Sequence, residues 1–233
     1  MKHGVKIPAL FLHIQKTAGT SIVQMAAQHY GSSNVSSHGD FVGRVSQEFV
    51  GKAFVSGHFG YSFARPLMRD RYTFTFLRDP IERVLSFYYF CQSRNPEELP
   101  IYRLARNLDL EGFVRAAVDD ELVKSRIWNS QVWRLATGPG SVAVDDMRAE
   151  EMLELAIAHL EEFSYIGFTE SVDDDVRAIQ QALQITDQII LGKENVTEGR
   201  ITTNDISAGV LSMIEEITQL DRQLYDIAWD LRK

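Results

Sequence analysis

The feature of this sequence that most constrains its fold is the alternation of short apolar segments with amphipathic helical ones. The first apolar segment, PALFLHI at Pro8–Ile14, has the length and the bounded ends of a buried strand. A helical pattern follows it at Gly19–His29. Further strands are predicted at Lys52–His58, Arg71–Asp79 and Tyr165–Glu170. This order predicts an α/β fold in three layers, with a mostly parallel central sheet flanked by helices.

The helices are predicted from their periodicity and from their end signals. In DPIERV, Asp79 is expected as the N-cap, Pro80 as the first helical residue and Glu82 as the reciprocal member of a capping box. The segment Ser207–Lys233 has apolar residues at steps of three and four, which predicts one long amphipathic helix. Further helical segments are predicted at residues 110–135, 147–163 and 172–183.

Length, charge and cysteine content limit the class of protein. We expect one domain, residues 1–233, because 233 residues suffice for one good core. A net charge of −8 argues against general nucleic-acid binding, which needs basic surface. Cys91 is the single cysteine, which excludes an internal disulfide and suggests a buried small side chain. No signal peptide or run of ~20 apolar residues is present, so we expect a cytoplasmic protein without a membrane span.

Ligands of parallel sheets bind at the carboxyl ends of the strands, which predicts chemistry just after Ile14, His58 and Leu77. The first of these positions carries QKTAGTS, residues 15–21, between a strand and a helix. Such a junction can hold a phosphate, because the first N–H groups of the helix are unpaired and its dipole is positive there.

The side chains of this loop also suit an anion. Gly19 lets the backbone approach closely, the hydroxyl groups of Thr17, Thr20 and Ser21 can donate hydrogen bonds, and Lys16 adds a positive charge. The loop is not a Walker A motif, in which the lysine follows the glycines, and no magnesium carboxylate is evident. We therefore predict an anion-binding loop without a metal. Taken alone, the stretch is equally consistent with an ordinary helix start and a solvent-exposed lysine.

The other two strand ends carry an arginine and a histidine. Arg78 can clamp a phosphate with its guanidinium fork, and Ser86, two turns into the next helix, can add a hydroxyl. In isolation, these two residues are better explained by pairing of Arg78 with a local carboxylate and by a solvent-facing Ser86. His58 lies between two glycines and can act as a general base, although a lone histidine is more often structural.

These three segments, in this order, resemble the carbohydrate sulfotransferases that use 3′-phosphoadenosine 5′-phosphosulfate (PAPS), and specifically the heparan sulfate 2-O- and 6-O-sulfotransferase branch. The resemblance is most specific at FLHIQKTAGTS (residues 11–21) and LRDPIERVLSFYYF (residues 77–90). Weaker similarity follows at NSQVWRLATG, YIGFTES and ENVTEGR, so that it covers nearly the whole chain. It implies a P-loop-like sulfotransferase fold and the transfer of a sulfuryl group from PAPS to a hydroxyl.

The resemblance also implies roles for residues in donor binding. Lys16 would stabilise charge on the oxygen that bridges the sulfate and the 5′-phosphate. The loop Thr17–Ser21 would hold the 5′-phosphate, with Ala18 standing where many relatives have glycine. Arg78 and Ser86 would bind the 3′-phosphate. No metal is required, because the lysine neutralises the leaving group.

Other roles concern the acceptor and the late loop. His58 would take the proton of the acceptor hydroxyl, and Thr197 and Arg200 would close over the nucleotide. Gln131 and Arg134 are as consistent with structural roles as with contacts to the acceptor. The acceptor is expected to be a glycan or a small hydroxyl compound, because a charge of −8 disfavours a polyanion. A compact bacterial enzyme is expected. An ATP- and magnesium-dependent kinase, or a non-catalytic nucleotide-binding module, is the alternative.

Overall fold

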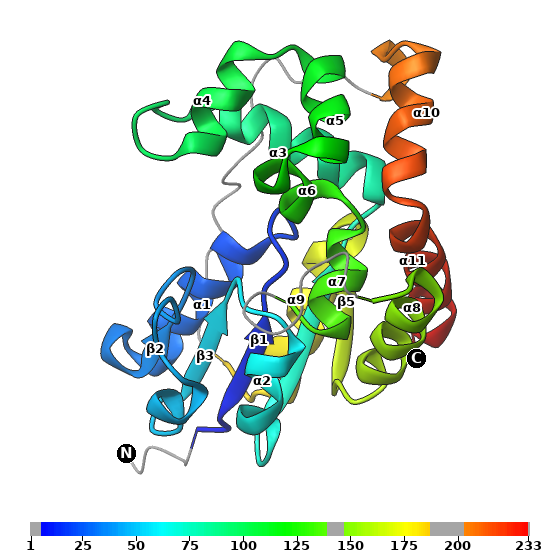
Figure 1. Cartoon of the computed structure of the whole chain (residues 1–233). Helices are drawn as coiled ribbons and strands as arrows, with labels where there is room; N and C mark the ends of the chain where they lie inside the picture. Colours follow the sequence, from blue (N-terminus) through cyan, green and yellow to red (C-terminus); the bar gives the residue numbers. More distant parts are fainter. Residues whose placement is uncertain (1–5, 139–146, 187–202, 233) are drawn as a thin grey trace.

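The chain contains a five-stranded sheet whose strand pairs are all parallel, in the order β2-β3-β1-β4-β5 (Figure 1). The computed structural model describes residues 6–138, 147–186 and 203–232. The predicted α/β class with a parallel sheet flanked by helices is confirmed. The strands are β1 (Ala9–Leu12), β2 (Val35–Ser36), β3 (Phe54–Gly57), β4 (Tyr72–Leu77) and β5 (Tyr165–Phe168).

Helices connect the strands and cover both faces of the sheet (Figure 1). One helix, α4, lies in a segment where no helix was predicted. The helices are α1 (Gly19–Tyr30), α2 (Tyr61–Met68), α3 (Pro80–Ser93), α4 (Pro100–Asn107), α5 (Leu110–Asp119), α6 (Glu121–Ile127), α7 (Ser130–Ala136), α8 (Ala149–Leu160), α9 (Val172–Ala182), α10 (Ala208–Ile217) and α11 (Gln219–Leu231).

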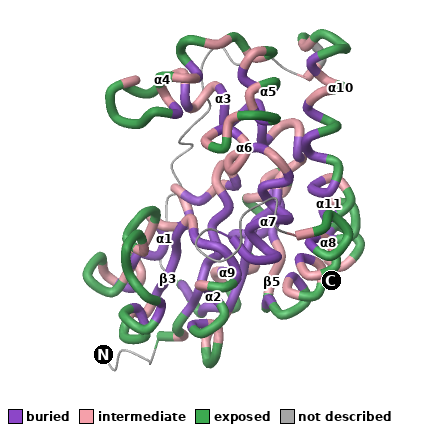
Figure 2. The backbone as a smooth tube through the Cα atoms, in the orientation of Figure 1, coloured by how far each residue is buried: buried purple, intermediate pink, exposed green. Residues whose placement is uncertain are grey.

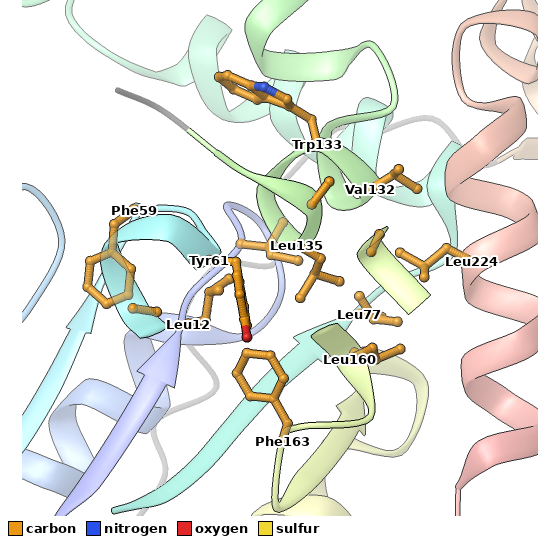
Figure 3. Packing of buried hydrophobic residues seen from close by; sticks show 14 of the residues in the cluster. Leu12, Phe59, Tyr61, Leu77, Val132, Trp133, Leu135, Leu160, Phe163 and Leu224 are labelled. Atoms are coloured by element: carbon orange, nitrogen blue, oxygen red, sulfur yellow. The ribbon is translucent and has the colours of Figure 1, made fainter. Parts of the chain in front are cut away.

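Strand β1 is buried on both faces, as its continuous apolar run predicts. Because successive side chains of a strand point to opposite faces, Leu10 and Leu12 pack with α2, α7, α8 and α11, whereas Ala9 and Phe11 pack with α1 and α9. Figure 3 shows the first of these clusters, with Leu12 near the ring of Tyr61. The two apolar layers hold β1 at the centre of the sheet, between β3 and β4.

A separate apolar cluster joins α3, α4, α5, α6 and α10. These helices gather beyond the carboxyl ends of the strands (Figure 1). Cys91 is buried within this cluster, as expected for a small apolar side chain. The carboxyl edge of the sheet is therefore covered by helices, and residues that follow β1, β3 and β4 lie between the two parts. The single-domain assignment stays a prediction.

The expectation of one long helix at Ser207–Lys233 is wrong, because the helix breaks at Thr218. Asn129, from a distant part of the chain, causes the break by bonding to both new ends. Its N–H donates to the Ile217 carbonyl (2.9 Å), and its side-chain oxygen accepts from the N–H groups of Leu220 (2.9 Å) and Asp221 (3.2 Å). Apolar periodicity continues through the break, so the pattern could not reveal it.

Candidate active site

The three predicted strand ends meet at one place in the structure. Strand β1 pairs with both β3 and β4, so the residues that follow these three strands are neighbours. The guanidinium of Arg78, after β4, donates from Nη1 to the carbonyl of Lys16 in the loop after β1 (3.2 Å). The Nδ1 atom of His58, after β3, lies 3.2 Å from the carbonyl of His13, which follows β1. The predicted lysine, arginine and histidine segments therefore form one site.

The loop between β1 and α1 has a strained backbone that suits an anion cradle. Lys16 and Ala18 both adopt the left-handed conformation, with φ of 71° and 62°. This conformation costs an L-residue roughly 1–2 kcal/mol and is free for glycine, which explains why glycine suits position 18. The Thr17 hydroxyl donates to the Ile14 carbonyl (2.8 Å) and braces the loop. Thr17 therefore supports the loop through its hydroxyl in this conformation, rather than offering that proton to an anion.

The N-terminus of α1 carries no side-chain cap and no acidic residue in its first turn. An uncapped helix start with a positive dipole favours a negatively charged partner. Lys16 and Arg78 lie beside it, so three positive features converge at this point. Thr20 and Ser21 lie in the first turn of α1 and are partly exposed.

His13 belongs to the site, although no sequence pattern singled it out. A Cβ atom added to Gly19 would lie 1.9 Å from the Nε2 atom of His13, so the histidine ring occupies the space that any other residue at position 19 would need. The ring also stacks on Phe11 and lies 4.4 Å, centre to centre, from the ring of His58. Burial lowers the pKa of His13 well below its ordinary range, and His58 adds to this effect.

The side chain of Lys16 lies against α3. Its Nζ atom is 4.0 Å from the centre of the Phe90 ring, a cation–π distance. Arg94 also lies over this ring, at 4.6 Å. Phe90 therefore fixes the Lys16 ammonium at the junction between the first loop and α3.

Gln131 holds the backbone of Arg78 with both ends of its amide. The N–H of Arg78 donates to Oε1 of Gln131 (3.0 Å), and Nε2 of Gln131 donates to the Arg78 carbonyl (2.9 Å). Gln131 is fully buried. The open question about its role is therefore answered in favour of a structural one, which is to position Arg78 at the end of β4.

The predicted capping box of α3 is only half correct. The Asp79 side chain accepts from the Glu82 N–H (3.0 Å), and Pro80 is the first helical residue, as predicted. However, the Asp79 N–H donates to the carboxylate of Glu170 (2.9 Å), just after β5, and not to that of Glu82. The Glu82 carboxylate lies 3.7 Å from Nη2 of Arg78 and accepts from the Thr203 hydroxyl (2.7 Å). The alternative explanation of Arg78, an ion pair with a local carboxylate, therefore also holds in the structure.

His58 is held in one orientation and kept neutral. Its Nδ1 donates to the His13 carbonyl, which leaves Nε2 as the atom with a free electron pair. Burial and the charge of Arg134 lower the pKa of His58 from 6.5 to about 3. Its carbonyl accepts a hydrogen bond from Nη1 of Arg134, and its N–H donates to the His38 carbonyl (3.1 Å). A neutral imidazole with a defined Nε2 acceptor has the form required of a general base.

Helix α7, which supplies Gln131 and Arg134, is buried along its whole length (Figure 2). Its N-terminus is capped by Asp221 of α11, whose Oδ1 accepts from the N–H groups of Gln131 (3.0 Å) and Val132 (2.8 Å). Its C-terminus meets the start of α2, where the Ser62 N–H donates to the Thr137 carbonyl (3.0 Å). Both ends of α7 are thus fixed to elements of the site.

A cavity of about 710 Å³ opens beside His58. The segment at residues 39–47 forms one wall, and the opposite wall includes Ser62, Phe63, Arg126 and Arg134. Arg134 is therefore both a support of His58 and part of the cavity wall. Neither the cavity nor Arg126 had a recognisable signal in the sequence.

The remaining predicted donor-binding positions are Ser86, Thr197 and Arg200. Ser86 lies on α3 with 7 % of its surface exposed, and its contact with a phosphate stays a prediction. Thr197 and Arg200 lie outside the described residues.

Comparison with known proteins identifies the family. The family model described as "Sulfotransferase family" matches residues 6–227, which is nearly the whole chain. The chain belongs to the sulfotransferase family. No curated protein matches this sulfotransferase significantly. The loop after β1, His58 and Arg78 all lie within the matched region.

Two further observations describe the enzyme. In the residues that the structure covers, no helix combines the length and apolar character needed to span a bilayer. Over the same residues, no group of three or more His, Cys, Asp or Glu side chains is arranged to hold a metal ion, even though His13, His38 and His58 are neighbours.

Proposed function

We propose that this sulfotransferase moves a sulfuryl group from PAPS to a hydroxyl group of a glycan or a small-molecule acceptor. The observation that carries the proposal is the hydrogen bond from Arg78 to the Lys16 carbonyl (3.2 Å). Because of this contact, the two segments assigned to opposite ends of a doubly phosphorylated adenosine are close enough for one molecule to reach both. The resemblance to the heparan sulfate 2-O- and 6-O-sulfotransferases supports a carbohydrate among the acceptors.

The residues around the first loop fit the donor. The uncapped start of α1 and the loop Thr17–Ser21 would hold the 5′-phosphate through backbone N–H groups. Arg78 and Ser86 would bind the 3′-phosphate, which distinguishes PAPS from donors based on adenosine monophosphate. Thr197 and Arg200 would close over the nucleotide from the late loop. PAPS supplies the sulfuryl group and a phosphate leaving group.

Lys16 would stabilise the negative charge that develops on the leaving phosphate. An ammonium in a partly buried site is effective there, because charge stabilisation is stronger where water is excluded. Contact with Phe90 keeps the ammonium at the loop, so little reorganisation is needed when the charge forms. Sulfuryl transfer resembles phosphoryl transfer, in which positioning and charge stabilisation account for most of the catalysis.

His58 would accept the proton of the acceptor hydroxyl at Nε2. Its Nδ1 hydrogen bond to His13 fixes the tautomer, and its depressed pKa keeps Nε2 unprotonated at neutral pH. Proton transfer by a positioned general base typically contributes about 10²–10⁴-fold to the rate. Arg134 supports this role by holding the His58 carbonyl.

Ligand-dependent thermal stability tests donor binding. Adenosine 3′,5′-bisphosphate, the product of the donor, should raise the melting temperature without added metal, and adenosine 5′-monophosphate should raise it much less. Stabilisation only by ATP with Mg²⁺ would contradict the proposal and favour a kinase.

Transfer of radiolabelled sulfate from PAPS to a panel of glycans and small alcohols tests the reaction. His58→Gln should lower kcat by about 10²–10⁴-fold. His159→Gln is the matched control, because His159 also donates from Nδ1 to a backbone carbonyl but lies on α8 (2.9 Å to Leu135). Equal activity in the two variants would show that His58 is not the base.

A further inference from the structure

In the part of the chain that the structure describes, two arginines beside the base lack the negative partner that buried charge normally requires. Arg134 is 2 % exposed, and Arg126 is partly buried on α6. Within the described residues, neither guanidinium lies within ion-pair distance of a carboxylate, and the Nε atom of Arg134 has no hydrogen-bond partner. Burial and the charges of Arg126 and Arg83 lower the pKa of Arg134 to about 9.

The nearby Arg83 provides a comparison within the same protein. Like Arg134, Arg83 is buried, donates to backbone carbonyls, those of Arg126 (3.1 Å) and Ile127 (3.4 Å), and has an Nε without a hydrogen-bond partner, but the charge of Asp221 opposes the effect of burial on its pKa. A buried charge without a partner costs several kcal/mol, of the order seen when one member of a buried ion pair is removed. Among the described residues, Arg126 and Arg134 therefore lack a countercharge, which is what an anionic ligand would supply.

The cavity lining indicates that this anion belongs to the acceptor and not to the donor. Both arginines line the 710 Å³ cavity, together with His58 and the segment at residues 39–47. Of the loop assigned to the donor, only Gln15 reaches the lining, and neither Lys16 nor Arg78 does. Over the described residues, no Asp or Glu lines the cavity.

Part of the cavity lining is apolar. Phe41 and Phe63 line it, and their rings meet edge to face at 5.6 Å. Val42 and Val45 also line it and remain 72 % and 60 % exposed, which is unusual for two apolar side chains at a cavity. The volume is within the range of roughly 300–1,000 Å³ typical of small-molecule sites.

From this arrangement we infer that the acceptor is a small amphiphile whose hydroxylated head group carries an anionic group. Arg126 and Arg134 bind the anion, which places the head group beside His58. The apolar part of the acceptor lies against Phe41, Phe63 and the two exposed valines. A carboxylate, a sulfate or a phosphate on the head group has the required chemistry. This inference rests on the proposed function, because it assigns the substrate class of the same site.

Four glycosides separate the two features of this acceptor. Octyl β-D-glucuronide has both the anion and the apolar chain, octyl β-D-glucoside lacks the anion, and methyl β-D-glucuronide lacks the chain. Methyl β-D-glucoside lacks both. Titration calorimetry on the full chain saturated with adenosine 3′,5′-bisphosphate should give the tightest binding for octyl glucuronide. We expect its dissociation constant to be about tenfold lower than that of octyl glucoside, because of charge-assisted hydrogen bonds to the anion. It should be about tenfold or more lower than that of methyl glucuronide, because of apolar burial of the chain.

The variant Arg126→Gln tests the assignment to the anion. It should remove most of the difference between the dissociation constants of octyl glucuronide and octyl glucoside. The dissociation constants of octyl glucoside and adenosine 3′,5′-bisphosphate should stay unchanged. Arg65→Gln, which removes an exposed charge from the neighbouring α2, is the control and should change none of the three. Arg126→Lys keeps the charge and should keep part of the difference, which separates loss of the anion contact from misfolding.

Three results would overturn the inference. Equal binding of octyl glucuronide and octyl glucoside to the wild-type protein would exclude an anion site, and this comparison needs no variant. Equal binding of octyl and methyl glucuronides would exclude the apolar part. A loss of adenosine 3′,5′-bisphosphate binding in Arg126→Gln would assign the arginine to the donor. If the wild-type protein did not bind adenosine 3′,5′-bisphosphate at all, the proposed function would fail, and the inference with it.

Discussion

Replacing Gln131 by leucine tests whether the site depends on the clamp that this residue forms around Arg78. Leucine is close to glutamine in size, so the substitution removes two hydrogen bonds, of 3.0 and 2.9 Å, with little change in packing. It leaves the N–H and the carbonyl of Arg78 without these partners beside a fully buried side chain. Each unsatisfied group costs about 1–3 kcal/mol, so we expect the free energy of unfolding to fall by about 2–4 kcal/mol.

The functional effect of Gln131→Leu should exceed what instability alone causes. Once the backbone at the end of β4 is released, the guanidinium of Arg78 loses its fixed position. We expect the dissociation constant for adenosine 3′,5′-bisphosphate to rise about tenfold, which corresponds to about 1.4 kcal/mol. Urea unfolding followed by circular dichroism measures the first effect, and titration calorimetry on the folded variant measures the second.

Gln92→Leu is the matched control for this experiment. Gln92 also uses its amide twice, donating to the Tyr88 hydroxyl (2.6 Å) and the Ala105 carbonyl (3.3 Å), but it lies between α3 and α4. It should lower stability by about 1–2 kcal/mol and leave nucleotide affinity unchanged. If Gln131→Leu weakens nucleotide binding no more than Gln92→Leu does, the clamp does not position Arg78 and the argument is refuted.

Three further predictions concern the loop, the base and the broken terminal helix. Gly19→Ala should lower stability by about 1–3 kcal/mol and reduce sulfate transfer, because the new Cβ would overlap the His13 ring; unchanged urea curves would contradict this. Between pH 6.5 and about 3, the unfolded chain binds a proton at His58 that the folded chain does not, so the free energy of unfolding should fall on acidification through this range. Melting temperatures measured across this range should fall less in His58→Gln than in the wild-type protein. Asn129→Gly keeps the left-handed backbone but removes the cap of α11, and should cost about 1–2 kcal/mol in urea unfolding; a wild-type midpoint would show that the cap is dispensable.

The sequence predicted four of the five strands, but not the two-residue β2, and indicated a candidate site at the strand ends, because these features depend on local patterns. Apolar runs gave the strands, and the rule that ligands bind at the carboxyl ends of parallel strands led directly to Lys16, His58 and Arg78. The start of α3 was also predictable, because Asp79 and Pro80 are local signals. Resemblance to known sulfotransferases supplied the chemistry that these patterns alone leave open.

The features that the sequence did not reveal depend on contacts between distant segments. The break in the terminal helix is caused by Asn129, about 90 residues earlier in the chain, and the residues around Thr218 carry no sequence signal for a helix end. Gly19 suggested an anion, and its contact with the His13 ring became visible only in three dimensions. Over the described residues, no carboxylate forms an ion pair with Arg134, and which charged groups surround a side chain is a property with no local pattern in a sequence.

The cap that Asp221 provides for α7 has a consequence for how the enzyme is synthesised. The N–H groups that donate to this cap belong to Gln131 and Val132, which are translated about 90 residues before Asp221. A nascent chain that ends before position 221 can complete the sheet but cannot fix the helix that supports Arg78 and His58. Catalytic competence should therefore arise late in translation, so that shortened translation products remain inactive even when most of the sheet has formed.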